Sequence, residues 1–198
     1  MVTQKVVILA SGGGSNASAL LDLWANGPIE AVGIWTNRKN AGVWNRDLKV
    51  PVYHFDPLED SQGLLELWQG MNATALVLAG YLKPVPALWI QAFGERCYNI
   101  HPALLPAFGG HGMYGHHIHE AVVAAGCTES GLSIHRVSEA YDEGPVLFQM
   151  RTLLRPGEQA DSLAARILEG EHWAFGRVVA ADLLGEPLPT KLPEGWYR

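Results

Sequence analysis

Cysteines and long apolar runs are scarce in this sequence. Only Cys97 and Cys127 occur among the 198 residues, and neither belongs to a CxxC or HxxxH pair. A zinc site or a redox-active dithiol of that spacing is therefore excluded, and we expect two free thiols. No apolar run approaches the roughly 20 residues of a membrane-spanning helix. The short apolar run after Lys5 is also too brief for a signal peptide, which predicts a cytoplasmic protein.

Positive charge is also in short supply. Lysine and arginine number 14 against 20 aspartates and glutamates, for a formal net charge of -6. Nucleic-acid binding normally needs a basic face that neutralises phosphates, so we expect no nucleic-acid partner and no membrane partner. With 48% hydrophobic residues and no repeat, low-complexity tract or linker, residues 1–198 are predicted to form a single domain.

Short apolar runs rich in β-branched residues alternate with stretches of helical periodicity in the first half of the chain. Strands are predicted over 6–10, 31–36, 52–55 and 75–79, and helices from near Asn16 and over 41–48 and 63–71. Strands that are apolar on both faces and separated by helices indicate a parallel sheet covered on both sides. The pattern predicts an α/β fold with a Rossmann-like, mostly parallel sheet.

The pattern changes in the second half of the chain. Two strand-like runs, 132–137 and 146–154, are joined by a short loop that contains Asp142, Gly144 and Pro145. This arrangement predicts an antiparallel C-terminal hairpin strand added to the parallel sheet. Apolar residues at helical spacing over 161–184 predict a long closing helix, and the tail from Gly185 is predicted to be loop.

A glycine-rich loop, Ser11-Gly12-Gly13-Gly14-Ser15-Asn16, separates the first predicted strand from the first helix. Its spacing is not GxGxxG, and it lacks the GK[ST] ending of a P-loop, so neither nucleotide motif is present. Glycines at a helix N-terminus can nevertheless present backbone N–H groups to an anion such as phosphate. A tight turn with Ser15 or Asn16 as helix cap explains the loop equally well.

Three polar residues at predicted strand ends form a candidate catalytic group. Asn99 and His101 alternate along one strand, so they project to the same face, and Pro102 prevents a regular continuation. An Asn99 amide and a protonated His101 could each donate to a developing oxyanion, at about 3 kcal/mol per donor. Asp142 could hold His101 protonated, or accept the proton of an attacking amine directly or through water. Purely structural roles are the alternative for each residue taken alone.

Five motifs occur in an order that resembles one enzyme family. They are Ser11-Gly12-Gly13-Gly14-Ser15-Asn16, Leu78-Ala79-Gly80-Tyr81-Leu82, Asn99-Ile100-His101-Pro102-Ala103-Leu104-Leu105-Pro106, Gly131-Leu132-Ser133-Ile134-His135 and Asp142-Glu143-Gly144-Pro145. Together they resemble the phosphoribosylglycinamide formyltransferases, within the folate-dependent formyltransferase superfamily. The resemblance implies transfer of a formyl group from the co-substrate 10-formyltetrahydrofolate to the amine of glycinamide ribonucleotide, a step of de novo purine biosynthesis.

The resemblance also implies a role for individual residues. Asn99, His101 and Asp142 would be catalytic, and Glu171 would lie near the substrate ribose. The expected substrate-phosphate and folate-binding residues are Gly14, Ser15 and Asn16 for the phosphate, and Leu82, Lys83, Pro84, Val85, Ser138, Glu139, Ala140 and Tyr141 for the folate. A monomer or homodimer is expected.

Four histidines lie in a glycine-rich segment, 108–119, and clustered histidines are typical of metal sites. His111, His116, His117 and His119 lack HExxH spacing and a second ligand cluster, so we expect no metal and interpret the segment as a substrate loop. Two alternatives for the whole chain stay open. It could be another folate-dependent formyltransferase or a formyltetrahydrofolate hydrolase, or it could be a non-catalytic phosphate-binding or nucleotide-binding Rossmann-like module.

Overall fold

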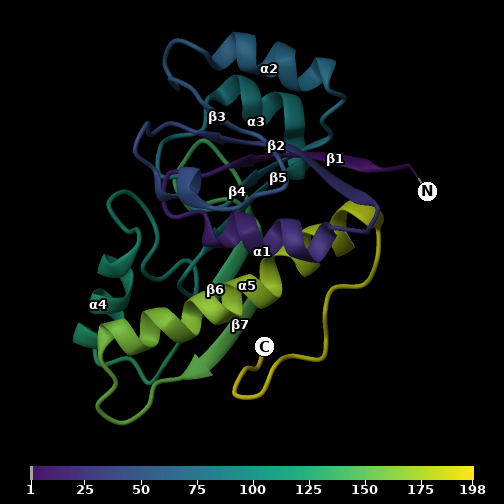
Figure 1. The fold of residues 1–198 in the computed structure, drawn as a ribbon. Helices are drawn as coiled ribbons and strands as arrows, with labels where there is room; N and C mark the ends of the chain where they lie inside the picture. Colours follow the sequence, from purple (N-terminus) through teal and green to yellow (C-terminus); the bar gives the residue numbers. More distant parts are fainter. Residues whose placement is uncertain (1) are drawn as a thin grey trace. The chain divides into compact units, whose positions relative to one another are not determined.

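The computed structural model describes residues 2–198, which fall into two units that adjoin in the sequence after Asn99. The boundary lies inside strand β5, Cys97–His101. Figure 1 shows the course of the chain and the labels of its elements. Among the described residues, no helix combines the length and the apolar character needed to cross a membrane.

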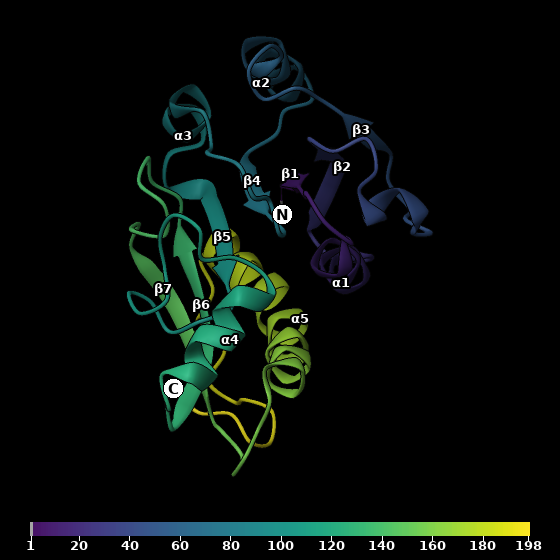
Figure 2. The ribbon, with the colours of Figure 1, turned by 90° about the vertical axis from the view of Figure 1, so that its left-hand side faces the viewer.

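The first unit is built on parallel strands. They are β1 Gln4–Leu9, β2 Ile29–Thr36, β3 Val52–His54, β4 Ala75–Leu78 and β5, in the order β3-β2-β1-β4-β5. Figures 1 and 2 show helix α1 (Ser15–Trp24) on one side of these strands, and α2 (Ser61–Gly70) and α3 (Ala87–Phe93) on the other. All four residues of β4 are buried, as expected for a strand covered on both faces.

Large aromatic side chains pack α2 and α3 against this sheet. The Trp68 ring meets Trp35 of β2 edge-on at 5.5 Å and Trp89 of α3 at 4.7 Å between ring centroids. All three indoles are almost fully buried. Such edge-to-face pairs stabilise a core beyond the area that they bury, so this cluster anchors both helices.

The second unit contains the antiparallel pair that the sequence predicts. Strands β6 (Glu129–Arg136) and β7 (Val146–Leu153) pair antiparallel, and the long helix α5 (Ala160–Leu184) contacts both β6 and helix α4 (His116–Ala124). A Cβ atom at Gly131 would lie 2.0 Å from the Met150 carbonyl oxygen, so this pairing requires glycine there. With mostly parallel strands and an antiparallel C-terminal pair, the predicted α/β fold class is confirmed.

The C-terminal residues follow the edge of β7. The backbone N–H groups of Tyr197 and Arg151 each donate to the other residue's carbonyl, at 3.0 and 2.8 Å. The Trp196 ring covers Gly170 of α5, where a Cβ atom would lie 2.5 Å from it. The tail predicted as loop from Gly185 is thus held against both β7 and α5.

One local prediction was wrong, and one alternative is not realised. The segment 41–48 forms only a short 3-10 helix, η1 (Gly42–Asn45), because it packs on the glycine loop: Val43 N donates to Gly12 O at 3.1 Å. Neither Ser15 nor Asn16 caps α1. The N-cap residue is Gly14, whose φ of 69° lies in the left-handed region, and no side chain caps the helix. A further 3-10 turn, η2 (Gly94–Arg96), leads into β5.

Candidate active site

The glycine loop is tied to the predicted folate-contacting segment through one buried serine. Ser11 is 1% exposed, donates to Asn37 Oδ1 at 2.7 Å and accepts a hydrogen bond from Leu82 N at 3.0 Å. Leu82 is the first residue of the predicted segment Leu82–Val85. Two segments that are 71 positions apart in sequence are therefore positioned by one hydroxyl group. Neither this role of Ser11 nor that of Asn37 was predicted from the sequence.

The loop conformation depends on glycine at its last position. A Cβ atom at Gly14 would lie 2.6 Å from Val43 Cγ2, and the left-handed φ adds a further penalty. Gly13 O accepts a hydrogen bond from Arg46 Nε. This guanidinium places a positive charge beside the predicted phosphate-binding residues Gly14, Ser15 and Asn16. Arg46 was also missed, since it is 33 positions from the residue that it contacts.

His101 and Asp142, which are far apart in sequence, lie together in the second unit. His101 Nδ1 is 3.5 Å from Asp142 Oδ2, and its side chain is 5% exposed against 10% for Asp142. The other ring nitrogen, Nε2, is 2.8 Å from the carbonyl oxygen of Phe108. Gly110 N donates to Asp142 Oδ2 at 3.0 Å. The imidazole and carboxylate that the sequence predicts to act together are thus adjacent and buried.

A second histidine borders the same carboxylate. His135 Nε2 lies 3.5 Å from Asp142 Oδ1, and His135 Nδ1 is 2.8 Å from Arg136 O. The Asp142 carboxylate is therefore placed between two imidazoles. His135 belongs to one of the five motifs, but its role was not predicted from the sequence. Its alternation with Gly131 and Ser133 along β6 is the signal that could have placed it on one face with them.

Burial and charge act in opposite directions on this cluster. Burial lowers the pKa of His101 below its usual value, against the raising effects of the Asp142 charge and the Phe108 carbonyl. For Asp142, burial alone would raise the pKa, but the His135 hydrogen bond, the His101 charge and the Gly110 N–H together lower it. Asp142 is consequently ionised at neutral pH, and its charge favours proton uptake by an otherwise neutral His101.

The turn that presents Asp142 is tightly constrained. Asp142 itself has a φ of 58°, in the left-handed region that non-glycine residues seldom adopt. A Cβ atom at Gly144 would lie 1.9 Å from the carbonyl oxygen of Arg136. Strain of this kind persists only where neighbouring structure enforces it, and it is concentrated at functional sites.

The remaining predicted residues lie at the strand ends and in α5. Asn99 is in β5, two positions before His101, and Glu171 is a buried residue of α5. In the loop between β6 and β7, Ser138 Oγ donates to Ala140 O at 2.9 Å. Tyr141 is 37% exposed, and its ring meets His111 edge-on at 5.9 Å. The exposed residues among those predicted to bind folate are Lys83, Pro84, Glu139, Ala140 and Tyr141.

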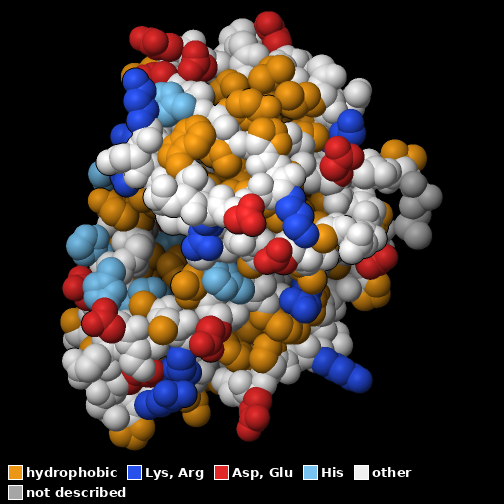
Figure 3. Space-filling model, in the orientation of Figure 1, with side chains coloured by type: hydrophobic (Ala, Val, Ile, Leu, Met, Phe, Trp, Pro, Cys, Tyr) orange, Lys and Arg blue, Asp and Glu red, His pale blue; other side chains and the backbone are white. Residues whose placement is uncertain are grey.

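The histidine-rich segment ends in helix α4. Figure 3 shows several histidines gathered over the region where Figure 1 places α4. His116 Nε2 lies 3.6 Å from Glu120 and 3.5 Å from Asp161. His119 is 5% exposed, and burial, together with nearby His116 and His101, lowers its pKa to about 4. Residues 2–198 contain no group of three or more ligand side chains placed to hold a metal ion.

Comparison with known proteins defines the class to which this fold and site belong. The sequence profile of the family described as formyl transferase matches residues 4–179. The chain therefore belongs to the formyl transferase family.

Individual relatives narrow the comparison to one kind of formyl transferase. The chain is 38% identical over 189 residues to the chloroplastic phosphoribosylglycinamide formyltransferase of Arabidopsis thaliana and 36% identical over 188 residues to that of Vigna unguiculata. In each case 90% of this chain is matched, and it spans 65% and 60% of the length of these relatives. The crystal structure of glycinamide ribonucleotide transformylase 1 from Symbiobacterium toebii superposes with a TM-score of 0.83 at 27% identity, covering 96% of this chain and 92% of that one.

Proposed function

We propose that the protein is a phosphoribosylglycinamide formyltransferase that moves a formyl group from 10-formyltetrahydrofolate to the amine of glycinamide ribonucleotide, in purine biosynthesis. The observation that carries this proposal is the buried contact of His101 with Asp142. The names of the similar proteins support formyl transfer to glycinamide ribonucleotide. Both substrates are small molecules. The predictions of a cytoplasmic location and of a monomer or homodimer stay predictions.

The chemistry follows from the polar groups. The substrate amine attacks the formyl carbon, and the negative charge that develops on the formyl oxygen accepts hydrogen bonds from the Asn99 amide and from His101 Nε2–H. In this role the formyl oxygen takes the place of the Phe108 carbonyl as acceptor. The developing charge adds to that of Asp142 and raises the pKa of His101 as the reaction proceeds, so a charged imidazole stabilises the intermediate.

Collapse of the intermediate completes the transfer. The amine loses a proton, directly or through water, to the Asp142 carboxylate, which His101 and His135 flank at 3.5 Å. The bond between the formyl carbon and the folate nitrogen then breaks, and that nitrogen takes up a proton to give tetrahydrofolate.

Other residues would bind the two substrates. Gly14, Ser15 and Asn16 would hold the substrate phosphate with Arg46 nearby, and Glu171 would contact the ribose. Leu82–Val85 and Ser138–Tyr141 would contact the folate.

Two alanine variants test the catalytic assignment. We expect Asn99→Ala and His101→Ala each to lower kcat by roughly 10²–10³, the usual cost of removing one oxyanion donor. The measurement is a spectrophotometric assay of tetrahydrofolate formation with both substrates. His54→Ala is the matched control, because it removes an exposed histidine of β3. Near-normal turnover in both site variants would refute the assignment and favour the non-catalytic binding module.

A control without the amine separates the transferase from its hydrolase relatives. A formyltransferase should release tetrahydrofolate only when glycinamide ribonucleotide is present. Equal release without the amine would show that water is the acceptor, and the protein would then be a formyltetrahydrofolate hydrolase. Activity with a different amine but not with glycinamide ribonucleotide would identify another formyltransferase of the superfamily.

A further inference from the structure

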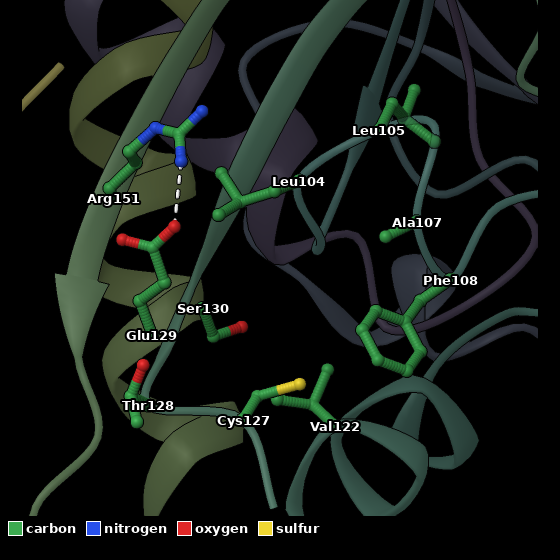
Figure 4. A pocket seen from close by; sticks show the side chains of 10 residues that line it. All are labelled: Leu104, Leu105, Ala107, Phe108, Val122, Cys127, Thr128, Glu129, Ser130 and Arg151. Carbon is green, nitrogen blue, oxygen red and sulfur yellow. Dashed lines mark hydrogen bonds and ion pairs between the residues drawn. The ribbon is translucent and has the colours of Figure 1, made fainter. Parts of the chain in front are cut away.

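The second unit contains a pocket that includes none of the catalytic, phosphate-binding, ribose-binding or folate-binding residues named above, although Phe108, the first residue of segment 108–119, lines it. Its volume is about 380 Å³, within the range of about 300–1,000 Å³ for small-molecule sites. Its walls come from the loop after β5, the end of α4, and strands β6 and β7 (Figure 4). Leu104, Phe108 and Val122 supply much of the apolar surface, and the Cys127 thiol adds to it.

One polar group in this pocket lacks a partner. Ser130 of β6 is 3% exposed, and its hydroxyl oxygen has no hydrogen-bond partner among residues 2–198. Figure 4 shows the hydroxyl directed toward the side of the pocket where Val122 and Phe108 lie. A buried hydroxyl without a hydrogen bond destabilises the folded protein, so its presence calls for an explanation. A ligand bound in the pocket could supply the hydrogen bond that Ser130 lacks.

The charged groups at the pocket are already paired with each other. Arg151 Nη1 lies 2.7 Å from Glu129 Oε1, and the Tyr197 hydroxyl donates to Glu129 Oε2 at 2.8 Å. Figure 4 shows this ion pair at one side, away from Phe108 and Val122. A charged ligand would have to break the pair to find a counterion. The lining therefore favours an uncharged ligand with an apolar body and one hydrogen-bonding group.

We propose that this pocket binds a small uncharged aromatic molecule with one hydrogen-bonding group, which pairs with Ser130 and whose binding is sensed by His101. The link is short. Leu104, Leu105, Ala107 and Phe108 form one wall, and the Phe108 carbonyl oxygen is 2.8 Å from His101 Nε2. A ligand against this wall changes the position of that carbonyl and thereby the hydrogen bond to His101.

The two cysteines provide an internal reporter of occupancy. Cys127 lines the pocket and is half-buried, whereas Cys97 is fully buried and burial raises its pKa to about 12. Benzyl methanethiosulfonate should therefore label Cys127 selectively. In that reaction the Cys127 thiol loses its proton to solvent, the thiolate attacks the sulfenyl sulfur, a disulfide forms, and methanesulfinate leaves. A ligand in the pocket covers the thiol and slows this labelling.

The first experiment uses p-cresol as the probe and follows labelling by mass spectrometry. We expect p-cresol to slow labelling of the wild-type protein in a saturable way, and Cys127→Ser to remain unlabelled. Ser130→Ala should still be labelled but need roughly fivefold more p-cresol for the same protection, since one hydrogen bond is lost. Without p-cresol the Ser130→Ala variant should unfold at a higher temperature than wild type, because the unpaired hydroxyl is gone. Absence of protection, or equal protection of both proteins, would overturn the assigned site.

The second experiment examines the link to His101. Saturating p-cresol should shift the imidazole resonances of His101 in an NMR spectrum, with His101→Asn identifying the signal. Resonances that do not move would refute the coupling through Phe108. Neither readout depends on formyl transfer, so failure of this inference and failure of the proposed function can be told apart.

Discussion

Replacement of His119 by leucine should make the protein more resistant to acid. His119 lies on α4, is 5% exposed, and has a pKa lowered to about 4 from 6.5 by burial and by two other histidines. The unfolded chain binds a proton at this residue below pH 6.5, whereas the folded protein does so only near pH 4. Between these values the unfolded state holds more protons, so the free energy of unfolding decreases as the pH falls.

The size of the effect follows from the two pKa values. Each pH unit between them costs about 1.4 kcal/mol, so acidification from pH 6.5 to pH 4 removes about 3 kcal/mol of stability through His119. Leucine cannot titrate and is of similar bulk. It also removes the buried Nδ1 atom, which has no hydrogen-bond partner within residues 2–198. The stability curve of His119→Leu should therefore be flatter than that of wild type across this range.

The assay is urea unfolding monitored by tryptophan fluorescence at a series of pH values from 4.5 to 7.5. Carboxylates also titrate at the acid end of this range. The informative quantity is therefore the difference in free energy of unfolding between variant and wild type at each pH. His117→Leu is the matched control, because it removes a histidine of the same helix whose side chain is 68% exposed. Parallel stability curves for wild type and His119→Leu would show that burial does not keep His119 neutral.

Two further substitutions test the glycine loop and a buried ion pair. Gly14→Ala should raise KM for glycinamide ribonucleotide about tenfold or more, since the left-handed conformation alone costs about 1–2 kcal/mol and the new Cβ meets Val43. Gly12→Ala, with open space around it, should leave KM unchanged, and equal values for both variants would refute this account. Arg166→Met should lower the free energy of unfolding at pH 7 by about 1.5–3 kcal/mol in urea titrations, the usual contribution of hydrogen bonds to a charged group. The Glu158 carboxylate loses its partner at 2.7 Å and keeps only the hydrogen bonds from Arg155 N and Ser162 Oγ. The hydrogen bond and charge of Arg166 lower the pKa of Glu158, so the ion pair's contribution to stability is lost as the pH falls through the pKa of Glu158 in the folded protein. If Arg166→Met remained equally destabilising relative to wild type at low pH, this explanation would be refuted.

The sequence predicted best those elements whose apolar pattern and final environment agree. The run at Ala75–Leu78 is buried on both faces and reads as an interior strand, and the apolar spacing of α5 is continuous over its length. The segment 41–48 was predicted wrongly because its helical spacing competes with a tertiary contact: Val43 N bonds to the glycine loop instead. Local pattern carries no information about such a partner.

The candidate site was predictable where the chemistry lies in short motifs. His101 and Asp142 could be paired because each lies at the end of an apolar run and belongs to a motif. Ser11, Asn37 and Arg46 could not be placed, because their roles arise only from contacts with loops distant in sequence. His135 lies between these cases, since its alternation along β6 is visible but its contact with Asp142 depends on how the following turn closes.

The contact of Tyr197 with Arg151 limits association between copies of this protein at a sheet edge. A strand edge with free N–H and C=O groups is a template on which another chain can add a strand. Tyr197 occupies both backbone groups of Arg151. Exposed Val146 and Leu153 lie at the two ends of the same strand. The β-bridge at Tyr197 thus covers part of the β7 edge, and deletion of residues 196–198 should increase self-association through β7.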